Sequence, residues 1–229
     1  MVREINNIWE AICGGALMLV LFVLPLFRPK HRKWGATDEE VQRELPGDEL
    51  VKDLKGWYHH AITINAAPAD VWPWIIQLGQ NKGGFYSYEL LENIVGSKIS
   101  NADNILPEFQ DVVVGGKVTI TPKAAPYIVA TIEPFHVFVL QLRVNLQTQE
   151  TIDINQPLPD KYQDSSWLFF LEEAAKGATR LTSRSRNDWN QSKTNTFFYG
   201  IFGVISQVMD IKMLKGIKKR AEAHKIQMV

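Results

Sequence analysis

A chain of 229 residues with 45% hydrophobic residues can bury a sizeable core, and it corresponds to one domain with appendages rather than two full domains. The 25 Lys and Arg residues balance the 25 Asp and Glu residues, so there is no net basic field and we expect no nucleic-acid partner. The single cysteine, Cys13, cannot form an internal disulfide, which is typical of a reducing compartment.

An apolar run occupies residues 8–27, IWEAICGGALMLVLFVLPLF, and contains one charged residue, Glu10. A helix of this length reaches roughly 30 Å, the thickness of the hydrocarbon core of a bilayer. Basic residues are denser after the run than before it, so the positive-inside rule predicts a single-pass membrane protein whose C-terminal domain is cytoplasmic. They are Arg3 before the run and Arg28, Lys30, Arg32 and Lys33 after it. The alternatives are a monotopic helix bent at Pro25 and a cleaved signal peptide, although a signal peptide should carry its charge before the run.

Residues 35–56 turn abruptly polar and acidic. Thr37 is a suitable N-cap for a short helix that runs to Arg43, and Pro46 followed by Gly47 should end it. We predict that this segment is a tether that sets the distance between the membrane and the globular domain.

The globular part begins with a strand and two helices. Residues 58–66, YHHAITINA, alternate in polarity and predict a strand that ends before Pro68. Residues 70–78 place apolar side chains at helical spacing. Residues 81–96, NKGGFYSYELLENIVG, then lead from two glycines into a second short helix.

The pattern next changes to period two and predicts a series of antiparallel strands. They lie at residues 117–120, 127–133, 137–143, about 149–154, 165–171 and 178–186. A long amphipathic helix over about residues 195–225 ends the protein, and its apolar stripe should pack on the sheet. The stripe comprises Phe198, Phe202, Ile205, Met209, Met213 and Ile217. The basic face, with Lys212, Lys215, Lys218 and Lys219, is either solvated or directed at anionic lipid.

This order of elements predicts an α+β fold in which a curved antiparallel sheet wraps around the terminal helix and leaves a cavity between them. HAITINAAPADVWPWIIQLGQ resembles the opening strand and helix of the START and birch-pollen-allergen-like superfamily, also called SRPBCC or polyketide cyclase/dehydrase-like. GGFYSYELLEN with NADNILPEFQDVVVGGKV is similar to a segment of a membrane-anchored bacterial branch, and GATRLTSRSR with MLKGIKKRAE is similar to its last strand and helix.

The resemblance covers about residues 34–223 and implies the helix-grip fold with a hydrophobic small molecule in its cavity. It supplies no catalytic residues. The expected organisation is therefore a membrane anchor with a basic flank over residues 1–34, a polar tether over 35–56 and a helix-grip ligand-binding domain over 57–229.

The sequence offers little for metal or phosphate chemistry. The histidines are scattered, and none has a carboxylate or cysteine at ligand spacing. They are His31, His59, His60, His136 and His224. The phosphate-cradling and nucleophile-elbow motifs are also missing from the sequence. We therefore predict neither a metal nor a cofactor.

Aromatic side chains are concentrated on the elements that should line the cavity, and aromatic walls suit an apolar ligand with one polar group. The candidate ligand-binding residues are Trp74, Phe85, Tyr86, Tyr88, Phe138, Trp167, Phe169 and Arg184. Each ring also fits an ordinary core position. Arg184 depends on the register of the last strand. If Leu181 faces inward, Ser183 and Ser185 leave room for a ligand and the arginines lie on the convex surface, which we favour. In the other register Arg184 could hold an anion.

We predict membrane-anchored binding or transfer of a hydrophobic small molecule, such as a lipid, an isoprenoid or a polyketide-like compound. The alternative is a cyclase or dehydratase with Tyr86, Tyr88, Glu133 or Arg184 as acid, base or anion holder. A scaffold with a collapsed cavity is a third hypothesis. Residues 81–96 are expected to act as a gate in which Gly83 and Gly84 permit movement.

Overall fold

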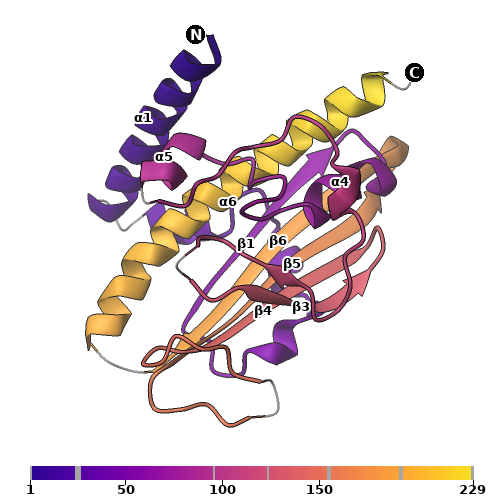
Figure 1. Ribbon diagram of the computed structural model, residues 1–229. Coiled ribbons are helices and arrows are strands. Elements are labelled where there is room, and N and C mark those ends of the chain that lie inside the picture. Colours follow the sequence, from indigo (N-terminus) through magenta and orange to yellow (C-terminus); the bar gives the residue numbers. More distant parts are fainter. Residues whose placement is uncertain are drawn as a thin grey trace.

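The computed structural model describes residues 2–23, 27–94, 96–122, 124–153, 156–190 and 193–227 (Figure 1). One curved sheet of six antiparallel strands has the order β1-β6-β5-β4-β3-β2. The strands are β1 Gly56–Ile64, β2 Lys117–Val118, β3 Tyr127–Glu133, β4 Val137–Asn145, β5 Tyr162–Ala174 and β6 Ala178–Trp189. Consecutive strands from β3 to β6 pair with one another, so the meander of hairpins is confirmed.

The long helix α6 crosses one face of the sheet, and α1 lies beside α6 (Figure 1). The helices are α1 Val2–Val23, α2 Arg28–Arg32, α3 Asp38–Gln42, α4 Pro68–Ile76, α5 Glu89–Ile94 and α6 Lys193–Gln227, with short 3-10 helices at Asp48–Leu50, Pro107–Phe109 and Ala175–Gly177. A curved antiparallel sheet that grips a long C-terminal helix is the helix-grip fold, so the predicted α+β class is confirmed. Pro25, the site of the bend in the alternative monotopic helix, lies outside the described residues.

The register of β6 decides which side chains face α6. Ser183 hydrogen-bonds Asp210 of α6, whereas Arg184 hydrogen-bonds the chain on the opposite face of the sheet. Leu181, Ser183 and Ser185 therefore point toward α6, as the favoured register predicted, because successive strand side chains alternate between the two faces. In the same way His60 points toward α6, where it meets Asp210, and His59 lies on the opposite face beside Arg184.

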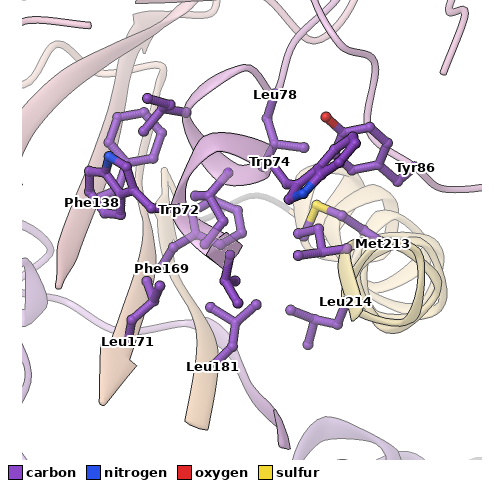
Figure 2. Packing of buried hydrophobic residues seen from close by; sticks show 14 of the residues in the cluster. Trp72, Trp74, Leu78, Tyr86, Phe138, Phe169, Leu171, Leu181, Met213 and Leu214 are labelled. Carbon is purple, nitrogen blue, oxygen red and sulfur yellow. The ribbon is translucent and has the colours of Figure 1, made fainter. Parts of the chain in front are cut away.

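The main core lies between the sheet, α4 and α6 (Figure 2). Met213 and Leu214 of α6 face Leu181 of the sheet, and Trp74 lies against Tyr86 near the same helix. Each large apolar side chain buried in this way contributes roughly 1.5–3 kcal/mol, so the grip on the C-terminal half of α6 is mainly hydrophobic.

Residues 35–56, predicted to be a tether, pack along the outer face of the sheet instead of extending from it. Leu45 is buried against an apolar patch of the central strands, formed by Val137, Val139, Leu168 and Phe170. Arg180 donates to both carboxylate oxygens of Glu40 at 2.7 and 2.8 Å, and Thr37 forms the predicted N-cap of α3. The physical reason is that β4 and β5 are apolar on both faces, so both faces of the sheet need a cover.

Two predictions about individual elements were wrong. The strand at about residues 149–154 is reduced to an isolated bridge between Thr151 and Val144, because Gln149 adopts a left-handed backbone conformation in the preceding turn; Ile154 lies outside the described residues. The stripe of the terminal helix was also assigned to the wrong face in its first half. Phe198 and Phe202 are 60% and 66% exposed, whereas Tyr199 stacks on Trp189 of the sheet.

Candidate functional site

Five of the predicted ligand-binding residues lie together in the closed part of the space between α6 and the sheet. Trp74 and Tyr86 meet with ring centroids 5.9 Å apart, and Phe138 and Phe169 with centroids 6.3 Å apart. Phe85 is buried in the same cluster. The Tyr86 hydroxyl accepts a hydrogen bond of 2.7 Å from Gln77 Nε2. The side chains of the protein thus fill this region.

Trp167 marks the boundary between the filled region and a more polar one. Its ring packs against Phe169 on one side and Tyr127 on the other, with centroid distances of 4.9 and 6.1 Å. Its indole Nε1–H donates to Ser183 Oγ at 3.1 Å. Trp167 therefore joins the aromatic core to a polar network.

Tyr88 and Arg184 are not brought to this space. Tyr88 is half-buried between α1 and α6, in a separate cluster with Leu21 and Val208. Arg184 lies on the outer face of the sheet, where it pairs with Asp48 and donates to the last carbonyl groups of α3. Its Nε–H also donates to His59 Nδ1 at 2.9 Å. Burial, together with the nearby Arg184, lowers the pKa of His59 to about 4, so His59 is a neutral acceptor at pH 7.

A buried polar network centres on Asp210 in the middle of α6. Asp210 Oδ1 accepts hydrogen bonds from Ser183 Oγ at 2.7 Å and from the Tyr58 hydroxyl at 3.2 Å. Asp210 Oδ2 lies 2.7 Å from Nδ1 of His60, whose side chain is completely buried. Burial and the adjacent Asp210 carboxylate hold the pKa of Tyr58 well above its usual range, so Tyr58 keeps its proton and remains a donor.

His60 connects this network to α2. Its Nε2 lies 3.1 Å from the carbonyl oxygen of His31, and its ring stacks on Tyr58 with centroids 4.6 Å apart. Both ring nitrogens thus face acceptors, and the tautomer of His60 determines which of them donates. Every polar group of the network has a partner, so its first role is to fix α6 and α2 on the sheet.

Beyond this network, the interior is lined by neutral polar and aromatic side chains. Tyr199 donates to Gln163 Oε1 at 3.1 Å, and Gln163 Nε2 donates to Ser165 Oγ at 3.1 Å. Burial, with a smaller contribution from Tyr199, raises the pKa of Tyr127 to about 12, although part of that side chain is exposed. Gln163 and Ser165 of β5 pair with Trp189 and Asn187 of β6, on the same face of the sheet as Ser183. We call this region, formed by Tyr127, Gln163, Ser165, Asn187, Trp189 and Tyr199, the polar recess.

The polar recess is open beside Gly203 of α6. Gly203 lies four residues after Tyr199 and seven before Asp210, so helical periodicity places all three on the sheet-facing side. A Cβ atom added at Gly203 would have no neighbouring atom within 4 Å. The space beside Gly203 thus lies between two contacts of α6 with the sheet, one at Tyr199 and one at Asp210.

Residues 83–87, in the segment expected to act as a gate, form a closely packed corner in this structure. A Cβ atom at Gly83 would lie 2.7 Å from the Tyr86 hydroxyl, and Gly84 has a φ of +76°. Asn101 Oδ1 accepts from the backbone N–H groups of Phe85 and Tyr86 at 3.1 and 2.6 Å. The two glycines are explained by close contacts and backbone geometry rather than by movement.

Comparisons with known proteins give structural neighbours at low similarity. No protein-family model matches the chain, and no curated protein matches it significantly. CalU16 from Micromonospora echinospora is 13% identical, with 73% of this chain and 84% of that chain covered and a TM-score of 0.31. The ZhuI aromatase/cyclase from Streptomyces sp. R1128 is 11% identical, with 72% and 93% covered and a TM-score of 0.36. Truncated norcoclaurine synthase from Thalictrum flavum is 12% identical, with 74% and 96% covered and a TM-score of 0.37.

Sequence reasoning missed most of the polar recess and the Asp210 network. One signal was available: Asp210 is an acidic residue that interrupts an apolar part of the terminal helix. An acidic residue at such a position is either exposed or paired inside the protein, and the sequence does not distinguish these cases. Gly203 gave no signal, because the space beside a glycine depends on how far the helix lies from the sheet.

Proposed function

We propose that the protein binds a largely apolar small molecule with at least one polar group, in the polar recess between α6 and the sheet. The observation that supports this is the open space beside Gly203, which faces aromatic rings and neutral hydrogen-bonding groups. Ligand sites in proteins typically combine apolar walls with a few placed polar groups. A lipid, an isoprenoid or a polyketide-like compound fits this description.

Different residues of the polar recess would contact different parts of the ligand. Tyr127 meets Trp167, at the boundary of the recess, edge to face, and the two rings present apolar surface to a hydrocarbon or ring system. Ser165 and Gln163 supply a hydroxyl and an amide that can bond a hydroxyl or carbonyl group of the ligand. Asp210 is committed to Ser183, Tyr58 and His60, which favours binding over acid-base chemistry.

Replacing Gly203 with leucine is expected to abolish ligand binding without unfolding the domain. The leucine side chain would enter the open space and occupy the room that we assign to the ligand. Apolar compounds extracted from the purified wild-type protein and from Gly203→Leu would be compared by mass spectrometry, and we expect at least a tenfold loss of any species that co-purifies with the wild type.

Gly200→Leu is the matched control, since Gly200 lies in the same helix, has equally open surroundings and faces solvent. It should retain the co-purified species. If Gly203→Leu retains the species as well, the ligand lies elsewhere. A wild-type protein that carries no apolar compound would oppose the proposal as a whole.

We further propose that α1 anchors the protein in a membrane. In the described part of the chain, Glu4–Val23 and Thr196–His224 are long and apolar enough to cross a bilayer. Most exposed large hydrophobic side chains of the described residues belong to α1 or to the start of α6. They are Ile5, Ile8, Trp9, Ile12, Leu17, Leu19, Val20 and Val23 on α1, and Phe197, Phe198 and Phe202 on α6. Contiguous apolar surface of this extent is typical of a membrane contact.

The basic residues after α1 support a cytoplasmic C-terminal domain, which is part of this proposal. A single-pass topology would separate Glu10 from Lys212, so we propose instead that α1 stays packed on α6 and lies in the cytoplasmic leaflet with its exposed apolar face in lipid. In cells that carry the full chain, we expect the protein to remain in membranes after an alkaline carbonate wash. Protease added outside intact spheroplasts should spare both an N-terminal and a C-terminal tag, and loss of either tag would refute this placement of α1.

The matched variants are Ile12→Lys with Leu19→Lys on the exposed face of α1, and Val113→Lys with Val114→Lys on an exposed loop of the domain. A lysine near the centre of a membrane segment costs roughly 2.5–3.5 kcal/mol, so the first pair should release the protein and the second should not. Retention of the first pair would mean that α1 is not the anchor.

A further inference from the structure

A second groove lies between α1 and α6, outside the space between α6 and the sheet. It has a volume of about 330 Å³, and the loop residue Tyr88 forms part of its wall. Leu17 of α1 and Val208 of α6 contribute apolar surface, and two lysines of α6 lie at the same groove. A volume of this size is at the lower end of the range for small-molecule sites.

The groove depends on the close approach of α1 to Tyr88. A Cβ atom at Gly14 would lie only 2.9 Å from the Tyr88 ring, so the glycine lets the helix rest directly on the aromatic face. Lys212 Nζ lies 5.6 Å from the centroid of the same ring. Tyr88 therefore joins the apolar and the cationic parts of the groove.

The two lysines of the groove have different partners. Lys212 donates to Glu10 Oε1 at 2.6 Å. Lys215 lies 5.2 Å above the ring of Trp34, and among the described residues it has no carboxylate within ion-pair distance. Two lysines and one glutamate line the groove, so it favours an anionic group at this end.

We propose that this groove binds an anionic phospholipid of the bilayer, with the phosphate at Lys212 and Lys215 and an acyl chain along Leu17 and Val208. The exposed apolar face of α1 places the groove at the lipid surface, and Trp9 at the groove is 63% exposed, as expected of an interfacial tryptophan. The site rests on the proposed membrane contact of α1, but it is independent of a ligand in the polar recess.

Binding is tested with the full chain in detergent micelles, by native mass spectrometry after addition of phosphatidylglycerol, phosphatidylcholine or inorganic phosphate. We expect one phosphatidylglycerol to remain bound, with at least tenfold preference over phosphatidylcholine. Inorganic phosphate should not displace it, since the acyl chain contributes to binding. Displacement by inorganic phosphate would indicate a free-anion site and would overturn the proposal.

Three variants of the same chain distinguish specific binding in the groove from nonspecific attraction of an anionic lipid to the positive charge of α6. Lys215→Gln should weaken phosphatidylglycerol binding at least tenfold, whereas Lys219→Gln, one turn further along α6 and outside the groove, should not change it. Leu17→Gln, at a partly exposed position, should weaken it through the acyl chain. Equal losses in the two lysine variants, or equal binding of both lipids, would refute the site. A chain that retains carbonate-resistant membrane association but shows no lipid preference would refute the groove alone.

Discussion

Replacing Asp210 with alanine is expected to lower the free energy of unfolding by about 3–5 kcal/mol, because it leaves several buried polar groups without a partner and each such group costs roughly 1–3 kcal/mol. The change leaves His60 buried without its carboxylate partner and removes the acceptor shared by Tyr58 and Ser183. Urea unfolding of the purified chain would measure the loss as a lower midpoint at unchanged slope.

Two further variants identify the cause of this loss. In Asp210→Asn the amide can still accept from Ser183 and donate to His60 Nδ1, while His60 Nε2 donates to the His31 carbonyl group, so the loss should be clearly smaller than with alanine. Asp38→Ala breaks an exposed ion pair with Lys33 and should cost about 1 kcal/mol or less. If Asp210→Ala costs no more than Asp38→Ala, the network does not hold α6 on the sheet.

Two glycines of α6 are expected to respond to alanine with opposite signs. Gly216→Ala should destabilise the protein by about 1–3 kcal/mol, because its Cβ atom would overlap the Tyr86 carbonyl oxygen and lie 2.6 Å from Tyr86 Cβ. Tyr86 cannot easily move away, since it has a positive φ and its N–H is bound to Asn101. Gly203→Ala has free space and should stabilise the helix by up to about 1 kcal/mol.

Thermal unfolding of both variants against the wild type would measure the two shifts in midpoint. The pair shares one helix and one chemical change, so a difference in sign reports the surroundings and not the helix propensity. If both variants stabilise the protein, α6 does not approach residues 81–96 as closely as the structure indicates.

The loop residues Gly83 and Gly84 show why part of the site could not be predicted. A glycine that allows movement and a glycine that is required by a close contact look the same in a sequence. The structure distinguishes them, because the Tyr86 hydroxyl and Asn101 occupy the places that side chains would need. A gate and a packed corner therefore correspond to the same residue pattern.

The exposed phenylalanines of α6 show that the position of an apolar residue is equally hard to predict from the sequence. Phe198 and Phe202 were assigned to the core because they share a helical stripe with Met213. A side chain that faces lipid and one that faces a core have the same hydrophobicity, so periodicity alone cannot assign the face. In the structure the sheet-facing positions include Tyr199 and Asp210, which carry polar groups.

The sequence by itself determined the strands, their two faces and a helix start wherever interactions between residues close in the chain decide them. Period-two alternation located the strands, β3 to the residue, and helix-capping chemistry located α3 behind Thr37. The alternation also separated His59 from His60 and Ser183 from Arg184. These features depend on residues that are close together in the chain, and the order of such residues can be read from the sequence.

Only the tertiary structure decided the surroundings of Asp210, Gly203 and Lys215. Asp210 meets Ser183 and His60 across separations of 27 and 150 residues, and the space beside Gly203 depends on how far α6 lies from the sheet. The groove at Lys215 exists because α1 folds back on α6. Each of these properties arises from distances between elements far apart in the chain, and residue patterns within one element do not contain such distances.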